Sequence, residues 1–273
     1  MSIRLALEGA GYRYAGAAEP ALRNVSLQLL AGRVLGVVGP NESGKSTLCL
    51  VAAGLAPGVI GGRLDGSVRI DGQATTTMRP HEMAQRCGLL FENAATQLSH
   101  MTRTVFEEVS LGPCNLGMPP AEVVARVRWA LGVVGIEALA GRDPTRLSGG
   151  QSQLVALASV LALRPGCLIL DEPTSELDPG GTRLVALALA RIARETGVAI
   201  MVVEHKTDVL AEIADEIVVM DRGAVAVAGP AATVLADPRL ADLGVDAPAR
   251  VRLERAVKAS RLDWSAALAG ALE

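Results

Sequence analysis

The sequence predicts an α/β fold in which a parallel sheet is accompanied by an N-terminal antiparallel β-layer and an inserted block of helices. Three short runs of apolar residues, Val34–Val38, Cys167–Leu170 and Val198–Val203, each lie beside helical sequence. Such runs are typical of parallel strands that are buried on both faces. The earlier segments Ile3–Leu7 and Val25–Leu29 alternate apolar and polar residues, which indicates half-buried antiparallel strands.

A further strand and a helical block follow. Val68–Ile70 precedes the turn pair Asp71-Gly72 and adds a strand to the N-terminal layer. From about residue 97 to residue 163 the sequence becomes helical, with amphipathic spacing through Ala121–Val134 and Gln153–Leu163. This block interrupts the alternation of strands and helices, so we expect an inserted helical subdomain at about 97–163.

The C-terminal part of the chain is expected to be a helical appendage. A short helix is predicted at Ala231–Leu235, after Gly229-Pro230, and the residues from Ala249 onward are rich in Ala, Leu and Arg. We therefore expect a main domain over residues 1–235 and an appendage over 236–273. Its basic residues, which indicate either a solvated face or a contact with a dimer partner or a membrane, are Arg250, Arg252, Arg255, Lys258 and Arg261.

Composition excludes several classes of protein. The chain of 273 residues is long enough for one large domain or two modest ones. Its formal charge of -3 gives no general attraction to phosphate backbones, so we expect no nucleic-acid partner. The four cysteines form no CxxC pair, which argues against a zinc site and against a secreted disulfide framework.

No segment reads as a signal peptide or a membrane span. The first residues lack the apolar core of a signal peptide, so we expect a reduced cytosolic protein. Two uncharged stretches, Ser46–Gly62 and Leu147–Leu163, approach the length of a membrane span. The first contains Pro57 and several glycines, and the second begins with Leu-Ser-Gly-Gly-Gln, so both are interpreted as buried helices with loops.

A phosphate-binding motif follows the strand Val34–Val38. Residues 39–47 read Gly-Pro-Asn-Glu-Ser-Gly-Lys-Ser-Thr and lead into a helical run, which is a P-loop in its strand–loop–helix setting. The glycines allow successive backbone N–H groups to face phosphates, and the helix start adds the positive end of its dipole. Lys45 would reach the β- and γ-phosphates, and Ser46 would offer its hydroxyl to Mg²⁺. The expected phosphate-binding residues are Gly39, Pro40, Asn41, Glu42, Ser43, Gly44, Lys45, Ser46 and Thr47.

Two carboxylates end the apolar run at Cys167–Leu170. Asp171 and Glu172 stand where a parallel sheet presents residues to a ligand, at the carboxyl ends of its strands. We expect Asp171 to hold Mg²⁺, directly or through water, and Glu172 to polarise the water that attacks the γ-phosphate. The alternative, that both carboxylates only cap the next helix, is weakened by the P-loop in the same chain.

A second helix start carries Leu147-Ser148-Gly149-Gly150-Gln151, directly before the amphipathic segment Gln153–Leu163. Its serine and backbone amides would present another anion-binding helix terminus. By itself the pattern indicates only an N-cap. In combination, the P-loop, this Leu-Ser-Gly-Gly-Gln motif and Leu-Ile-Leu-Asp-Glu-Pro resemble the ATP-binding cassette (ABC) family in order and spacing, over about residues 1–235.

This resemblance implies a P-loop NTPase (RecA-like) core, ATP and Mg²⁺ as cofactors, ATP hydrolysis and a second cassette subunit as partner. Ser148 and Gly150, with Gly149 and Gln151 in the same motif, would bind the nucleotide held by the P-loop of the partner. Lys45, as the lysine of the P-loop, is expected to contribute to catalysis.

Three further positions match residues of the family. Asp178, in Ser-Glu-Leu-Asp, matches the loop that links the two nucleotide sites across the dimer, although a solvated turn is the alternative. His205 follows the strand Val198–Val203 and matches the histidine that contacts the γ-phosphate, to which a neutral imidazole can donate one hydrogen bond. Tyr14 matches the aromatic residue that stacks on adenine, with a role in the core as the rival interpretation.

Glu92 departs from the family pattern, in which this position is usually glutamine in a loop that links the Mg²⁺ site to the transmembrane partner. A glutamate can still ligate Mg²⁺ and bind water, but it adds negative charge near the γ-phosphate. We therefore expect slower or retuned hydrolysis and not inactivity.

Three connecting segments narrow the resemblance. Residues 91–98, residues 112–119 and residues 203–206 are similar to the ATPase subunits of energy-coupling factor transporters, which import vitamins and transition-metal ions. This implies a transmembrane coupling subunit and a membrane substrate-binding subunit as partners, and a peripheral location on the cytoplasmic face of the cell membrane. The alternatives are the ATPase of a conventional ABC importer, a soluble ABC ATPase without a transport role, and a subunit that does not hydrolyse ATP.

Overall fold

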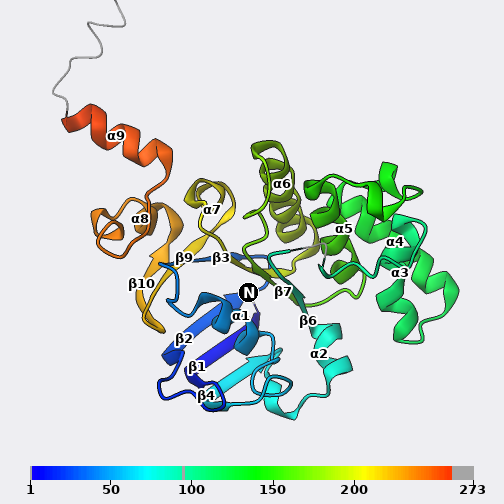
Figure 1. The fold of residues 1–273 in the computed structure, drawn as a ribbon, viewed down its shortest axis with the longest axis horizontal. Helices are drawn as coiled ribbons and strands as arrows, with labels where there is room; N and C mark the ends of the chain where they lie inside the picture. The colour runs from blue at the N-terminus through cyan, green and yellow to red at the C-terminus, as the bar shows by residue number, and fades with distance from the viewer. Residues whose placement is uncertain (1, 94–95, 260–273) are drawn as a thin grey trace, which may run out of the picture.

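The N-terminal strands form a four-stranded antiparallel sheet in the order β2-β1-β4-β5 (Figure 1). The computed structural model describes residues 2–93 and 96–259. The strands are β1 (Ile3–Arg13), β2 (Leu22–Leu30), β4 (Arg63–Ile70) and β5 (Gln73–Ala74). The first three contain the predicted strands but are longer. In β1 the register with β2 shifts between Leu7 and Ala10, so the alternation that identifies a strand is interrupted there.

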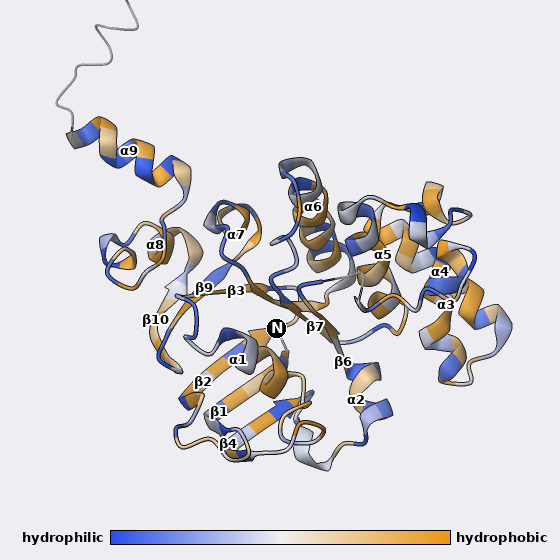
Figure 2. Cartoon of the chain, in the orientation of Figure 1, coloured by the Kyte–Doolittle hydropathy of each residue, from blue (hydrophilic) through white to orange (hydrophobic). Residues whose placement is uncertain are grey.

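A second, six-stranded sheet has the order β10-β9-β3-β8-β7-β6, and all its pairs are parallel except β10 with β9. The strands are β3 (Val34–Val38), β6 (Cys87–Leu90), β7 (Cys167–Asp171), β8 (Ala199–Val203), β9 (Glu216–Asp221) and β10 (Ala224–Pro230). Every residue of β3 and β8 is buried, as their apolar runs predict, and β3 is coloured as hydrophobic in Figure 2.

Helices cover both faces of this parallel sheet. On one face α1 (Lys45–Ala52) packs between the two sheets, in a core shared with β1, β7 and β8. On the other face lie α6 (Pro179–Thr196) and α7 (Thr207–Ile213), as Figure 1 shows. A shorter helix, α2 (Pro80–Arg86), leads into β6. The architecture is therefore the predicted α/β core with an N-terminal β-layer.

The inserted helical block lies between the neighbouring strands β6 and β7. It consists of α3 (Val105–Asn115), α4 (Pro120–Val134) and α5 (Gly149–Leu161), which pack on one another (Figure 1). The fifth helix begins earlier than the apolar spacing indicates because Ser148 caps it within the Leu-Ser-Gly-Gly-Gln motif.

The C-terminal part contains α8 (Ala231–Leu235), which has the predicted bounds, and α9 (Ala249–Ala259). In Figure 1 α9 projects away from the sheets, and in Figure 2 it carries both hydrophilic and hydrophobic residues. Residues 260–273 of the predicted appendage, Arg261 among them, lie outside the described residues. Within residues 2–93 and 96–259, no helix combines the length and the apolar character that a membrane crossing requires.

Candidate functional site

The loop between β3 and α1 has the backbone shape that a phosphate-binding loop requires. A Cβ atom at Gly39 would lie 2.3 Å from the carbonyl oxygen of Met220, and one at Gly44 would lie 2.8 Å from that of Ala21. Gly44 also has a φ of 97° and stands directly before the first residue of α1. Only glycine fits these two positions, so the loop keeps its shape through close backbone contacts on both sides.

Lys45 folds back over this loop. Its Nζ donates to the carbonyl oxygens of Gly39, at 2.9 Å, and Pro40, at 2.8 Å, and the residue is only 5% exposed. Burial lowers the pKa of Lys45, while the nearby carboxylates Glu172 and Asp171 raise it. The ammonium group is thus held beside the backbone that would surround a phosphate.

The hydroxyl of Ser43 is buried, and it has no hydrogen-bond partner in the part of the chain that the structure describes. A buried hydroxyl without a partner is costly, because it has lost its bonds to water and gained none in exchange. Since Ser43 belongs to the same loop as Gly44 and Lys45, its free hydroxyl fits a ligand oxygen in this loop.

Asp171 brings the end of β7 to the P-loop helix. Its Oδ1 accepts a hydrogen bond from the hydroxyl of Ser46 at 3.3 Å. Burial raises the pKa of Asp171; the bond from Ser46 lowers it, Glu172 and Glu92 raise it, and Lys45 lowers it. The arrangement places a hydroxyl and a carboxylate side by side, and such oxygen ligands are those that Mg²⁺ prefers.

Glu172 and His205 meet across two neighbouring strands. Glu172 has a φ of 50°, and its backbone N–H donates to the carbonyl oxygen of Val203 at 3.0 Å. Its Oε1 lies 2.8 Å from Nε2 of His205, which follows β8. The side chain of His205 is 44% exposed and that of Glu172 is 19% exposed, so the pair faces the open edge of the site.

Tyr14 lies against the first turn of α1. Its hydroxyl is 3.1 Å from Oγ1 of Thr47, and its ring stands edge-on to Tyr12, with 4.9 Å between the ring centroids. The residue is partly exposed, in contrast to the fully buried Tyr12. Tyr14 is therefore beside the P-loop helix with a surface that a ligand can reach.

Glu92 follows β6 and lies close enough to Asp171, at the end of β7, to raise the pKa of Asp171. The beginning of its loop is fixed by Gln97, whose side chain accepts from the backbone N–H of Phe91 at 2.8 Å and donates to the carbonyl oxygen of Leu89 at 3.1 Å. Glu92 also lines a cavity of about 170 Å³ together with Leu147, Gly149 and other residues at the start of α5.

The remaining site residues form a second group at the starts of α5 and α6. Ser148 caps α5, where its Oγ accepts from the N–H of Gln151 at 3.4 Å, and Asp178 caps α6, where its Oδ1 accepts from the N–H of Gly181 at 2.6 Å. A Cβ atom at Gly150 would lie 2.9 Å from Cα of Gly181, so the two helix starts are in close contact.

Among the described residues, the main cavity of the second group is separate from the P-loop, whereas Glu92 shares the cavity of about 170 Å³ with Gly149. Ser148, Gly149, Gly150 and Asp178 line one cavity of about 460 Å³, and no P-loop residue lines it. The first group consists of Lys45, Ser46, Asp171, Glu172 and His205. Tyr14 contacts Thr47 next to this group, and Glu92 lies near enough to raise the pKa of Asp171. The predicted residues thus fall into two groups on one chain.

Two residues at this edge were not among the site residues predicted from the sequence. Glu204 and Lys206 flank His205, and Glu204 is only 1% exposed although it carries a carboxylate. The sequence does contain a signal for the burial of Glu204. A charged residue that directly follows the apolar run Val198–Val203 lies at the carboxyl end of a buried strand.

Comparison with known proteins gives a consistent result. The family model described as ABC transporter matches residues 22–175. A putative ABC transporter ATP-binding protein of Pyrococcus horikoshii is 40% identical over 90% of this chain and 87% of its own length. The nickel import ATP-binding protein NikO of Rhodobacter capsulatus is 41% identical over 84% of this chain and 90% of its own length. The energy-coupling factor transporter ATP-binding protein EcfA of Methanosarcina acetivorans is 38% identical over 92% and 89%, respectively.

Solved structures with the same fold include cbiO1 of Clostridium perfringens, part of the ABC transporter complex cbiONQ. It superposes with a TM-score of 0.78 and 30% identity, over 88% of this chain and 93% of that chain. A dimeric ATP-binding cassette in a post-hydrolysis state with ADP and Pi superposes with a TM-score of 0.69 and 27% identity, over 83% of this chain and 98% of that chain.

Proposed function

This chain belongs to the ABC transporter family of ATP-binding proteins, and from that membership we propose that it powers an energy-coupling factor importer of a vitamin or a transition-metal ion. One observation carries the proposal. Lys45, Asp171, Glu172 and His205 meet at one edge of the sheet, in a chain that is 38% identical to EcfA and 41% identical to NikO over most of its length.

The chemistry proposed for the first group of residues is hydrolysis of the γ-phosphate. Lys45 and the loop amides would bind the β- and γ-phosphates, and the free hydroxyl of Ser43 would donate to one of their oxygens. Glu172 would accept the proton of the attacking water. The neutral imidazole of His205 has one N–H, which contacts the Glu172 carboxylate at 2.8 Å in this structure and would instead donate to the γ-phosphate when nucleotide is bound. Tyr14 would stack on adenine.

The residues present fit Mg²⁺. Ser46 and Asp171 place a hydroxyl and a carboxylate oxygen 3.3 Å apart, which is compatible with two neighbouring positions around a small octahedral cation. We propose that these two residues hold the ion, that Glu92 contributes through water or directly, and that the ion, when bound, neutralises charge on the phosphate oxygens.

A second cassette would complete each nucleotide site. Ser148, Gly149, Gly150 and Gln151 present a capped helix start to a cavity that contains no P-loop residue of their own chain among those described. A helix start with exposed amides is an anion-binding surface. We therefore propose that this surface binds the nucleotide held by the P-loop of a partner subunit, with Asp178 in the contact between the two sites.

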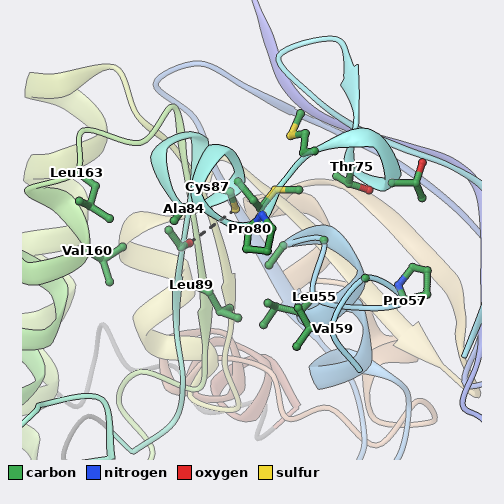
Figure 3. Close-up of a pocket in the computed structure, with 17 residues that line it drawn as sticks. Leu55, Pro57, Val59, Thr75, Pro80, Ala84, Cys87, Leu89, Val160 and Leu163 are labelled. Carbon is green, nitrogen blue, oxygen red and sulfur yellow. Dashed lines mark hydrogen bonds between the residues drawn. The ribbon is translucent and has the colours of Figure 1, made fainter. Parts of the chain in front are cut away.

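The membrane subunit would dock in an apolar groove next to the helical insert. The groove has a volume of about 520 Å³ and no charged lining residue among those described; Figure 3 shows it between the Leu55–Val59 loop, α2 and the end of α5. Leu89 and Cys87 of β6 lie at its base, and β6 leads directly to Glu92. An exposed apolar groove of this kind fits an apolar segment of a protein partner.

The proposed assembly places the chain on the cytoplasmic face of the cell membrane, attached through its partners. Residues 1–235 would form the ATPase domain and residues 236–273 an appended helical segment. The partners would be a second cassette subunit, a transmembrane coupling subunit and a membrane subunit that binds the substrate.

Purification of the chain from its native membrane in a mild detergent, followed by mass spectrometry of the proteins that accompany it, tests this proposal. We expect a small integral-membrane substrate binder and a separate transmembrane coupling subunit. Recovery of two permease chains with a soluble binding protein would instead indicate a conventional importer. Recovery of no membrane protein would overturn the transport role.

A pair of variants tests the groove in the same experiment. Val59 is 67% exposed at the groove, and Leu187 is 54% exposed on α6, outside it. Val59→Asp should lose the membrane subunits and keep its ATPase rate within about twofold, because the new charge would be buried against an apolar partner. Leu187→Asp should retain the membrane subunits. Retention of the membrane subunits by Val59→Asp would show that the groove is not their docking surface.

A further inference from the structure

Glu204 ties the backbone around His205 to the segment that follows Glu172. One of its oxygens, Oε1, accepts from the backbone N–H groups of His205, at 2.9 Å, and Lys206, at 3.2 Å. The other, Oε2, accepts from the hydroxyl of Thr174 at 2.5 Å. Both Glu204 and Thr174 are essentially without solvent exposure. A carboxylate that is buried so fully must keep these bonds, because its charge has no contact with water.

Lys206 binds the same segment from the other side. Its Nζ donates to the carbonyl oxygens of Thr174, at 2.6 Å, and Leu177, at 3.2 Å, and to the hydroxyl of Thr182, at 3.0 Å. An ammonium group has three N–H donors, and all three have a partner here. Lys206 directly follows His205, so its side chain connects this part of the chain with the loop of residues 174–178 and with the first turn of α6.

Thr174 is held by both charged side chains at once. Its hydroxyl donates to Glu204 and its carbonyl oxygen accepts from Lys206, so it cannot shift without breaking a charge-assisted hydrogen bond. The 174–178 loop begins two residues after Glu172 and ends at Asp178, which caps α6. The loop thus runs from the group around Glu172 to the group at the starts of α5 and α6, and Glu204 and Lys206 hold it through Thr174 and Leu177.

We propose that Lys206 is a positioning residue that couples the γ-phosphate side of one nucleotide site to the opposite site of the dimer. A displacement of His205 would be carried by Lys206 and Glu204 to the 174–178 loop and from there to Asp178. This inference rests on the proposed function, because it takes His205 as the contact to the γ-phosphate and Asp178 as the contact to the second site.

A double-mutant cycle tests the coupling on the full chain in its purified complex. Lys206→Met keeps the length of the side chain and removes the three donors, and Asp178→Ala removes the cap at the other end of the loop. We expect each change to lower kcat roughly tenfold and the double variant to lose about the same tenfold, and not about a hundredfold, because both changes break one connection. The KM for ATP should change less than twofold.

A second double-mutant cycle, used as a reference, separates coupling between two residues from a general loss of activity. Tyr14 contacts Thr47 and Tyr12, whereas Lys206 contacts Thr174, Leu177 and Thr182, so Lys206→Met and Tyr14→Ala should have additive effects on kcat/KM. Lys258→Met, in α9, serves as a control for loss of a lysine and should leave kcat within about twofold of the wild-type value. Additive loss in the Asp178 cycle, with both single variants active and folded, would overturn the inference.

A second pair of variants keeps the test informative if Lys206→Met does not fold. Thr182→Val removes one of the three acceptors of Lys206 and leaves the lysine in place. It should be non-additive with Asp178→Ala in the same way, and Lys206→Arg, which keeps donors at this position, should recover most of kcat. Absence of ATP hydrolysis by the wild-type complex would contradict the proposed function itself, whereas active but additive variants would contradict only the coupling.

Discussion

At the residue scale, the ionised groups of the site are held at an electrostatic cost. Burial lowers the pKa of Lys45 and raises the pKa of Asp171, so both charged forms are disfavoured in the nucleotide-free chain. Phosphate beside Lys45 and a cation beside Asp171 would relieve both penalties. The site therefore gives up stability in the absence of ligand in order to bind charged ligands, as is common for functional sites.

The raised pKa of Asp171 gives a prediction for stability against pH. Because the folded chain holds this proton more tightly than the unfolded chain, the contribution of Asp171 to stability is present below its unfolded pKa and is lost as the pH rises through its folded pKa. Asp171→Asn should therefore raise the Tm of the nucleotide-free protein at neutral pH.

This difference in Tm should disappear below about pH 3, where the wild-type carboxyl group is protonated in both states. Thermal unfolding of both proteins without nucleotide, at neutral pH and at acidic pH, measures it. A variant that is less stable than the wild type at neutral pH would contradict this electrostatic account of Asp171.

Glu92 adds a negative charge that raises the pKa of Asp171. Glu92→Gln removes this charge, so it should change kcat and the Mg²⁺ concentration for half-maximal rate by about two- to tenfold. Steady-state ATPase assays over a range of Mg²⁺ concentrations provide the measurement. Glu195→Gln, an exposed position that pairs with Arg191, is the matched control and should change neither value. Unchanged turnover and Mg²⁺ dependence in Glu92→Gln would refute a role for the extra charge.

Local sequence could predict which residue types the site needs but not all of their contacts. The P-loop and the two carboxylates are recognisable because each requires a fixed order of residues next to a strand. The 2.8 Å contact of Glu172 with His205 depends on the pairing of β7 with β8, which brings together residues 33 positions apart. The burial of Glu204 depends on the pairing of β8 with both of its neighbours, β7 and β3.

At the element scale, the strands that could be predicted best are those buried on both faces. The bounds of β3 agree with the apolar run Val34–Val38 because no solvent-facing residue interrupts it. The alternation in β1 is disturbed by its irregular register near Gly9, which hides the second half of that strand. The sequence did not predict β5, β6, β9 or β10. β6 has only four residues, and its place in the sheet depends on pairing with β7.

The contact between the starts of α5 and α6 gives a prediction for stability. Gly150→Ala would place a Cβ 2.9 Å from Cα of Gly181, so the two helices would have to separate. We expect a loss of about 1–3 kcal/mol in the free energy of unfolding. Denaturant unfolding measures this, with Gly141→Ala as control, because a Cβ there would meet no described atom within 4 Å. Equal stability of the two variants would contradict a tight contact.

At the scale of the whole molecule, the main result of the tertiary structure is that the predicted site residues fall into two groups. The motifs are recognisable in the sequence, but their placement on one surface depends on how the helical insert packs against the sheet. Ser148 and Asp178 line a cavity that no described P-loop residue lines, and Thr174, Glu204 and Lys206 connect the segments after β7 and β8. This arrangement suits an ATPase whose two sites act together.

In the proposed mechanism, Glu172 drives ATP hydrolysis in this chain. The most direct test compares phosphate release by the purified complex with that of its Glu172→Gln variant, while binding of a fluorescent ATP analogue is measured in parallel. We predict Mg²⁺-dependent hydrolysis by the wild type and a fall in kcat of about 10²–10⁴-fold in the variant, with nucleotide affinity unchanged. A variant that hydrolyses ATP within about twofold of the wild-type rate would contradict the assignment of Glu172 and the mechanism built on it.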